Sequence, residues 1–239
     1  MIISKKLLFP ALLLLSGASS QNAFAISAYN SDASVTYSIS ASNINTSGSL
    51  DDLDIFDDGP YFYDDFTSSS SQTSESVEYF SDLNTSYSHS FQAEDTISDG
   101  SAYSESWWEY SIGFENFSAN SDDTYKITID YSYDLTARAI GENADTDAIF
   151  EYESYNGRAR GYDYINASIT GTIENSPAST SGSKSISFFL EAGEFEEIYF
   201  DIGLTGYLEA TPEASPVPVP AAFWLFGSAL LAFPRFRKS

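Results

Sequence analysis

The stretch that decides the fold is YKITIDYSYDL, residues 125–135. Its odd-numbered positions are apolar or aromatic, and its even-numbered positions are polar or charged. Strict alternation over eleven residues indicates a β-strand with one buried face, because successive side chains of a strand point to opposite sides. We therefore predict that Tyr125, Ile127 and Ile129 face a core while Lys126 and Asp130 face solvent.

Similar patterns recur on both sides of this stretch. Further strands are predicted at residues 35–39, 79–91, 103–117, 148–155 and 162–173. Residues 184–190 and 198–208 flank the turn-like sequence EAGE (191–194), and we predict that they form a hairpin. The Ser- and Thr-rich segments 67–76 and 175–183 are predicted to be exposed loops.

These elements predict an all-β fold. Between its two ends, the chain has no stretch with apolar residues at helical spacing over three turns. Many strands joined by Ser-, Gly- and Asn-rich turns favour an antiparallel β-sandwich or jelly roll for residues 26–210. The chain has no cysteine, so burial and hydrogen bonds between strands must stabilise this domain without disulfides.

Charge is distributed unevenly along the chain. All thirty-five acidic residues lie between residues 26 and 216, whereas five of the ten cations lie at the two ends. The middle of the chain therefore carries a formal charge of about −30. A surface of this kind repels nucleic acid and anionic lipid headgroups, so we exclude nucleic acid as a partner.

The N-terminus has the three regions of a secretory signal peptide. Two lysines precede an apolar run, residues 7–15, and Ala23 and Ala25 give the small-x-small pattern that signal peptidase accepts. We predict a signal peptide at residues 1–25, with cleavage before Ile26. The alternative is an N-terminal membrane anchor, which is disfavoured because the apolar run is shorter than the roughly 20 residues that span a bilayer.

The C-terminus carries a second apolar segment. A Pro-rich spacer at residues 211–220 leads into residues 221–234, which we predict to be one short transmembrane helix, and residues 235–239 form a basic tip. Its thirteen-residue apolar run would rise roughly 20 Å as a helix, which is short for a hydrocarbon core of about 30 Å. Basic residues favour the cytoplasmic side, so residues 26–210 are predicted to lie outside the cytoplasm. A hydrophobic strand of the main domain is the less favoured alternative.

This tail closely resembles the PEP-CTERM sorting signal of Gram-negative bacteria, in its Val-Pro-x-Pro variant. The matching features are a proline motif, an apolar core with Trp and Gly, and a basic end: Val217, Pro218, Val219, Pro220, Trp224, Gly227, Arg235, Arg237 and Lys238. The resemblance implies recognition by an exosortase, a membrane cysteine protease that cuts near the proline motif. It also implies export through an inner-membrane-tethered intermediate to the cell surface or the exopolysaccharide matrix.

Two features of the tail depart from the family's pattern. Val219 replaces the middle glutamate, and Pro234 and Phe236 interrupt the run into the basic cluster. These departures leave the subtype of processing enzyme open. A GPI signal is the competing interpretation, but such signals normally end in apolar rather than basic residues.

Seven aspartates are concentrated between residues 51 and 65. Carboxylate oxygens at this density in a loop suit Ca²⁺, and the candidate ligands are Asp51, Asp52, Asp54, Asp57 and Asp58. The spacing departs from the EF-hand pattern, because Phe56 occupies its fifth position. The alternative is a solvated acidic loop with its apolar residues packed inward, namely Leu53, Ile55, Phe56, Tyr61 and Phe62.

Catalysis is disfavoured by the residues present. His89 is the only histidine, and its alternating surroundings predict a strand residue on the polar face. The chain has no Gly-x-Ser-x-Gly motif for a serine nucleophile. Carboxylates are so abundant that no pair stands out for glycoside hydrolysis. We therefore predict that the protein is not an enzyme and needs no cofactor beyond a candidate Ca²⁺.

Adjacent tryptophans supply rings on which a sugar could stack. In a strand, Trp107 and Trp108 point to opposite faces, so one is predicted in the core and the other at the surface, with Tyr103 and Tyr110 nearby. The plain alternative is that both tryptophans only pack the domain. Two hypotheses follow: a secreted structural or adhesive protein of the cell surface, and a calcium-dependent carbohydrate-binding module anchored the same way. Extracellular polysaccharide is a candidate partner.

Overall fold

The computed structural model describes residues 26–45, 49–157 and 159–211. Eight β-strands and no helix are found in these residues: β1 (Ser27–Asn43), β2 (Leu53–Phe66), β3 (Gln72–Val77), β4 (Ser86–Ile97), β5 (Gly100–Asn116), β6 (Thr124–Ser154), β7 (Arg160–Glu191) and β8 (Phe195–Ala210). All the strand pairs are antiparallel, which confirms the predicted all-β, antiparallel fold. Within this part of the chain, no helix is long and apolar enough to cross a membrane. The predicted signal peptide and sorting tail lie outside the described residues.

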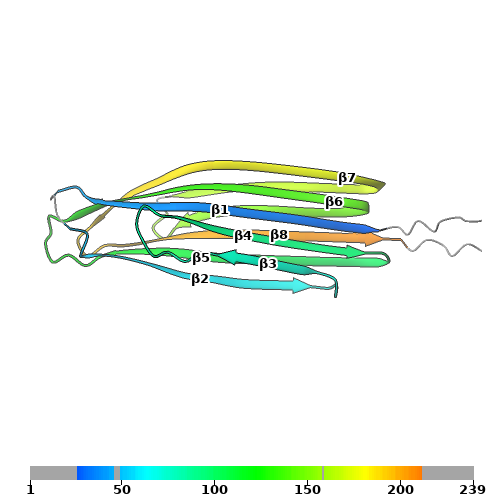
Figure 1. The fold of residues 1–239 in the computed structure, drawn as a ribbon, viewed down its shortest axis with the longest axis horizontal. Helices are drawn as coiled ribbons and strands as arrows, with labels where there is room; N and C mark the ends of the chain where they lie inside the picture. Colours follow the sequence, from blue (N-terminus) through cyan, green and yellow to red (C-terminus); the bar gives the residue numbers. More distant parts are fainter. Residues whose placement is uncertain (1–25, 46–48, 158, 212–239) are drawn as a thin grey trace, which may run out of the picture. The chain divides into compact units, whose positions relative to one another are not determined.

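The sheet folds over on itself through its two longest strands, β6 and β7. The strand order is β2-β5-β8-β6-β1-β4-β3, and β7 pairs with β6. Residues 125–141 of β6 pair with β1, whereas residues 143–154 pair with β8. The register shifts between Gly141 and Asn143, where β6 and β7 turn back together (Figure 1). Two facing layers result, and a jelly-roll-like order of strands stays a prediction.

Glycine is required at this bend. Gly141 has a φ of +106°, which side chains of L-residues rarely permit. A Cβ added there would also collide with the backbone carbonyl of Ile26, at the start of the neighbouring chain segment. The two backbones approach so closely at position 141 that only glycine fits there. This is the position at which β6 passes from one layer to the other.

Aromatic rings fill the space between the two layers. Tyr37 of β1 stacks on Phe200 of β8 with ring centroids 6.1 Å apart, and Tyr133 stacks on Phe150 at 4.8 Å. The second pair joins the two halves of β6 across the core. All odd-numbered side chains of residues 125–135 are buried, as the alternation predicts. Each buried ring of this kind removes about 150–250 Å² from water, so the rings contribute substantially to the stability of the domain.

Two of the predicted loops are strands. Residues 72–77 form β3 and pair with β4, and residues 175–183 lie in β7 and pair with β6. Their hydroxyl-rich composition reflects strands at the edge of a sheet with one wet side, rather than loops. Conversely, residues 79–85 of a predicted strand are not in one: β4 begins at Ser86.

The predicted hairpin around EAGE is wrong. The turn itself is present, with the Glu194 N–H donating to the Glu191 carbonyl at 3.0 Å. However, the strands on either side of it have different partners: β7 pairs with β6, and β8 pairs with β5 and with the second half of β6. The turn therefore carries the chain from one layer to the other, which a local pattern does not reveal.

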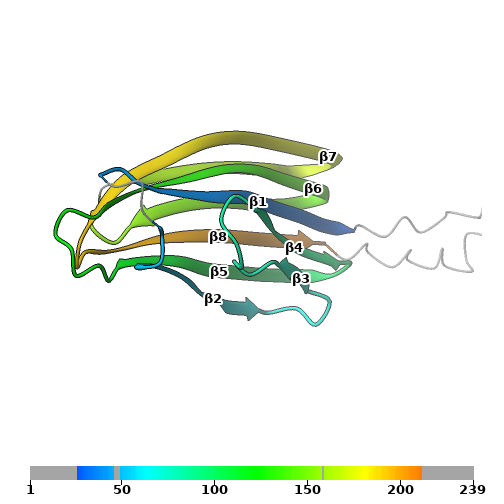
Figure 2. The ribbon, with the colours of Figure 1, turned by 60° about the vertical axis from the view of Figure 1, so that its left-hand side comes forward.

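Each unpaired edge in the described part of the sheet carries features that discourage pairing with another chain. β2 contains five aspartates, and β3 is only six residues long. β7 contains Pro177 and also Lys184, whose Nζ lies 5.7 Å from the Tyr152 ring centroid. β7 and β2 lie on opposite sides of the strand domain in both views (Figures 1 and 2). The exposed edges are therefore poor docking sites, and the outward faces of the layers remain as candidate surfaces.

Candidate functional site

Large aromatic rings gather on the outward side of one layer. This layer contains β2, β5, β8, the second half of β6 and the first half of β7. Several of its outward rings are exposed or half-buried, and six of them belong to β5, β7 and β8: Tyr103, Trp107, Tyr162, Tyr164, Tyr199 and Tyr207. We call the surface formed by these six residues the aromatic face.

Trp107 lies flat on the aromatic face. Its partner across the β5–β8 pair is Gly203. A Cβ built on Gly203 would meet three carbons of the indole at 2.8, 2.9 and 3.0 Å, so the ring presents its face to β8. The absence of a side chain at position 203 thus leaves room for the ring. The indole Nε1–H donates to Glu105 Oε1 at 2.7 Å, which sets the orientation of the ring.

The next tryptophan points the other way. Trp108 is 1% exposed and packs on Phe91 with ring centroids 4.7 Å apart. The prediction that one tryptophan is in the core and the other at the surface is confirmed. Tyr110, named above as a ring near the tryptophans, is also buried, and its hydroxyl forms a hydrogen bond with that of Tyr37 at 2.7 Å. Like Trp108, Tyr110 lies on the inward side of β5.

Carboxylates hold the tyrosines of the aromatic face in place. Three hydroxyls each donate to one carboxylate: Tyr103 to Glu105 at 2.8 Å, Tyr164 to Asp147 at 2.7 Å and Tyr199 to Glu197 at 2.6 Å. In each case the hydrogen bond to a carboxylate raises the pKa of the tyrosine to about 12. The phenols therefore stay protonated, and the rings stay fixed, over the whole physiological range of pH.

A row of carboxylates runs beside Trp107. Glu109 of β5, Asp201 of β8 and Glu151 of β6 are direct partners across adjacent strands. Burial raises the pKa of Asp201 to about 6, with the negative charges of Glu109, Glu151 and Glu153 adding to the shift. The carboxylates of the row therefore repel one another when they are ionised.

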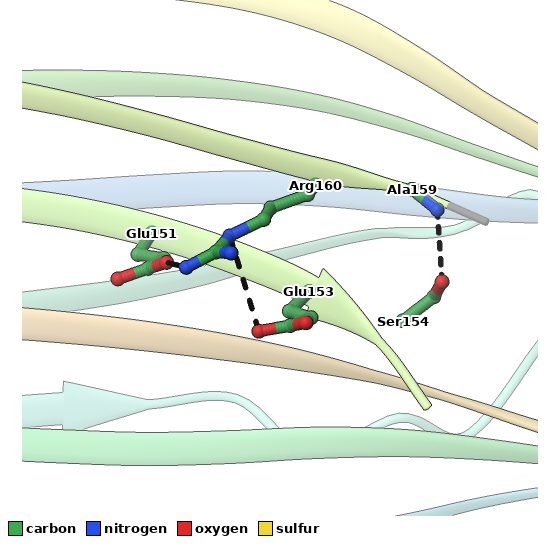
Figure 3. A network of polar contacts seen from close by, with 5 residues as sticks. All are labelled: Glu151, Glu153, Ser154, Ala159 and Arg160. Carbon is green, nitrogen blue, oxygen red and sulfur yellow. Dashed lines mark hydrogen bonds and ion pairs between the residues drawn. The ribbon is translucent and has the colours of Figure 1, made fainter. Parts of the chain in front are cut away.

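One cation lies at the far end of this row. Figure 3 shows Arg160 of β7 between two carboxylates of β6, with Nη2 3.1 Å from Glu151 Oε1 and Nε 4.0 Å from Glu153 Oε2. Close by, the Ala159 N–H donates to Ser154 Oγ at 2.8 Å and closes the turn between β6 and β7. Arg160 thus compensates the β6 end of the row, and no ion pair links it to Asp201 or Glu109 in the described structure.

The outward side of the other layer has a different character. It is covered by Ser and Thr hydroxyls, such as Thr128 and Ser187, whose oxygens are 2.9 Å apart. Two open grooves of about 290 and 420 Å³ cross it, and both are lined mainly by Ser, Thr and Asp side chains. Hydroxyls alone offer hydrogen bonds but no flat apolar surface, so the aromatic face is the stronger candidate site.

The candidate calcium ligands are not brought together. Asp51 and Asp52 lie in the turn before β2, whereas the other three lie in β2 itself, so the predicted acidic loop is wrong. Along β2, Asp54 and Asp58 are exposed, but Asp57 is half-buried and accepts hydrogen bonds from inside the domain. Pairing of β2 with β5 imposes this alternation. In the described ranges, no group of three or more acidic or histidine side chains is arranged to hold a metal ion.

The apolar residues of the same segment divide in a similar way. Leu53 and Ile55 pack against the core as predicted. Phe62 also lies on the inward side and packs on Trp108 with ring centroids 5.2 Å apart, although it is 48% exposed. Phe56 and Tyr61 were expected to pack inward too, but they are 38% and 59% exposed. Both lie on the outward side of β2, and no second layer covers that side of this edge strand.

The prediction for His89 is wrong. The imidazole is 3% exposed and lies in the core, 4.4 Å from the Tyr110 ring centroid. Within the described structure its Nε2 has no hydrogen-bond partner. Burial lowers the pKa of His89 to about 4, although a hydrogen bond to the Glu78 backbone partly opposes the shift. Because Tyr87, His89 and Phe91 share one side of β4, the histidine belongs to the apolar side of its strand.

Sequence reasoning missed most of the aromatic face. The alternating tyrosines of β7, Tyr162 and Tyr164, were a usable signal, because both must lie on one side of a strand. Nothing local connected them with Tyr199 or Trp107, since strand partners are set by the long-range register. The signal cleavage residues Ala23 and Ala25 and the sorting motif at 217–238 lie outside the described residues.

Comparisons with known proteins do not identify a family. No protein-family model matches the chain, and no curated protein matches it. The carbohydrate-binding module TmCBM61, solved in complex with β-1,4-galactotriose, is 9% identical, with 39% of this chain and 70% of that chain covered and a TM-score of 0.12. The structural-genomics target SoR45 is 13% identical, with 62% and 92% covered and a TM-score of 0.14. Scores of this size do not indicate a shared fold, so neither similarity enters the functional argument.

Proposed function

We propose that the strand domain binds polysaccharide through the aromatic face, and that the protein is a non-enzymatic, adhesive component of the cell surface or extracellular matrix. Trp107 carries the proposal. Its indole lies face-on against Gly203, so its opposite face is directed away from the sheet. Sugar rings have C–H-rich faces that stack on flat aromatic surfaces of this kind.

The surroundings of Trp107 suit an extended ligand. Trp107, Gly203, Ile149 and Tyr164 are successive partners across β5, β8, β6 and β7. With strands about 4.8 Å apart, this row spans about 14 Å across the layer. Hydroxyl groups of a bound glycan would find acceptors on both sides of the row, with Glu105 and Asp147 on one side and the row of Glu109, Asp201 and Glu151 on the other. A polymer crossing the strands would therefore meet rings and acceptors together.

We propose binding rather than glycoside hydrolysis for this arrangement. Hydrolysis needs two carboxyl groups on either side of the scissile bond. Here Glu105 and Asp147 each accept hydrogen bonds from neighbouring side chains, and both lie on the outward side of a sheet. Calcium is not part of the proposal, because the candidate aspartates are divided between a turn and the two sides of β2.

The two ends of the chain are proposed to direct its export and its sorting to the cell surface. Residues 1–25 would direct export, and the Val217–Pro220 motif would present the chain to an exosortase while residues 221–234 tether it in the membrane. The support is the sequence pattern. Mass spectrometry of the protein from its host tests this, with an N-terminus at Ile26 and loss of mass beyond the proline motif expected. A Pro218→Ala/Pro220→Ala variant should retain its tail.

Affinity electrophoresis tests the binding proposal. Native gels are cast with or without each of several soluble polysaccharides, and the purified full chain is run as wild type, Trp107→Ala and Tyr79→Ala. Tyr79 is 58% exposed and lies in the connection between β3 and β4, which are not strands of the layer that carries the aromatic face, so it is the matched control. At least one polysaccharide should retard the wild type and Tyr79→Ala but not Trp107→Ala. Equal retardation of the wild type and both variants, or no retardation by any polysaccharide, would contradict the proposal.

A further inference from the structure

An apolar ring and an uncompensated negative charge lie side by side on the aromatic face. Glu109 follows Trp107 by two residues on β5, and Asp201 precedes Gly203 by two residues on β8. These positions place both carboxylates on the outward side that carries the indole. In the residues that the structure describes, neither carboxylate has a hydrogen bond or an ion pair. The position of the indole on Gly203 is an observation independent of the charges, and it is the one on which the proposed binding surface rests.

The charge beside the ring is costly to the free protein. Asp201 is half-buried and is flanked in register by Glu109 and Glu151, so three carboxylates occupy adjacent strands. Burial raises the pKa of Asp201 to about 6, and repulsion from these neighbours adds to the shift. Arg160 relieves Glu151 at the other end of the row but has no ion pair with Asp201. A positive group placed between Asp201 and Glu109 would remove this repulsion.

The geometry points to a polysaccharide with free amino groups as the ligand, its sugar ring stacked on Trp107 and its ammonium group beside Asp201 and Glu109. This inference rests on the proposed function and names the substrate class of the same site. An amino sugar offers both features that the surface requires, an apolar ring face and a cation. An acidic polysaccharide would be repelled by the row of carboxylates, and a neutral one would leave their charge uncompensated.

Two matched oligosaccharides test the inference: the β-1,4-linked glucosamine hexamer and its fully N-acetylated counterpart. Binding of each to the full chain is measured by calorimetry at about pH 6.5. The amino form should bind about fivefold more tightly, as one partly exposed ion pair permits. Asp201→Asn should abolish that preference. The control Asp134→Asn removes an exposed acid from the hydroxyl-covered layer and should leave it unchanged.

The outcomes separate this inference from the proposed function. Equal affinity for the two hexamers, with both lost in Trp107→Ala, would overturn the amino-sugar inference and leave polysaccharide binding standing. Absence of binding by either hexamer, together with no retardation in the polysaccharide gels, would overturn both. Equal weakening by Asp134→Asn and Asp201→Asn, with no effect of Trp107→Ala, would show attraction of a polycation to an acidic protein and would also overturn the inference.

Discussion

His89 should make the domain sensitive to acid, and the size of the effect follows from its surroundings. The folded state holds the imidazole in an aromatic cage where burial lowers its pKa to about 4, against 6.5 for the unperturbed side chain. Between these values the unfolded chain takes up a proton that the folded chain does not. The free energy of unfolding must therefore fall as the pH falls through this window, and the stabilisation is complete only above pH 6.5.

The magnitude is set by the difference between the two pKa values. One pKa unit corresponds to about 1.4 kcal/mol, so the full loss is roughly 3 kcal/mol, of which about 2 kcal/mol has gone by pH 5. Asp201 works in the opposite direction, because its raised pKa favours the folded state as the pH falls below about 6. The contribution of His89 is therefore measured as a difference between the wild type and His89→Gln, which leaves Asp201 in both.

Urea unfolding at a series of pH values provides this measurement. From pH 7.5 to pH 5, the wild type should lose about 2 kcal/mol more stability than His89→Gln. The chain has a single histidine, so one imidazole resonance in an NMR titration gives the pKa of the folded state directly. Parallel stability curves for the two proteins, or an NMR titration midpoint near 6.5, would refute the reasoning.

Three further substitutions test other parts of the structure. Gly203→Ala should push the indole of Trp107 off the sheet and weaken polysaccharide binding about tenfold in gel retardation, with thermal unfolding little changed. Asp201→Asn should stabilise the domain at pH 7 by about 1 kcal/mol after allowance for solvent screening, and urea unfolding should show this gain shrinking as the pH falls through about 6 and vanishing below 3.8. Asn116→Ala should lower the free energy of unfolding by about 2 kcal/mol, because the buried Nδ2 donates to the Leu190 and Asp123 carbonyls, each at 3.1 Å, and both hydrogen bonds would be lost.

Alternation along the chain predicted the strands well where one side is buried. Residues 125–135 have the predicted inward and outward sides, and residues 103–117 and 198–208 correspond closely to β5 and β8. The method failed where a strand has few apolar residues, as at 175–183, because hydrogen bonding to β6 holds that segment without a large contribution from burial. The composition of residues 175–183 is therefore typical of a loop, although their backbone is paired with that of β6.

Only one feature of the candidate site, the direction of its tryptophan, could be predicted from the sequence. The opposed directions of Trp107 and Trp108 follow from the geometry of any strand. The position of Gly203 under the indole does not, because it depends on the register between two strands that lie almost a hundred residues apart. The same long-range pairing brings Asp201 between Glu109 and Glu151. Local patterns contain no information about which strands become neighbours.

The salt dependence of binding separates the contribution of stacking on Trp107 from that of the attraction between the ammonium group and the carboxylates. The attraction between an ammonium group and a carboxylate pair is screened by ions, and the Debye length falls from about 10 Å at 0.1 M salt to about 3 Å at 1 M. Stacking on Trp107 is not screened in this way. The affinities of the glucosamine hexamer and its N-acetylated form should therefore converge as salt rises to about 1 M, with the N-acetylated form changing little. A preference that persists at 1 M salt would mean that the amine is recognised by shape or hydrogen bonding, and the row of carboxylates would lose its role.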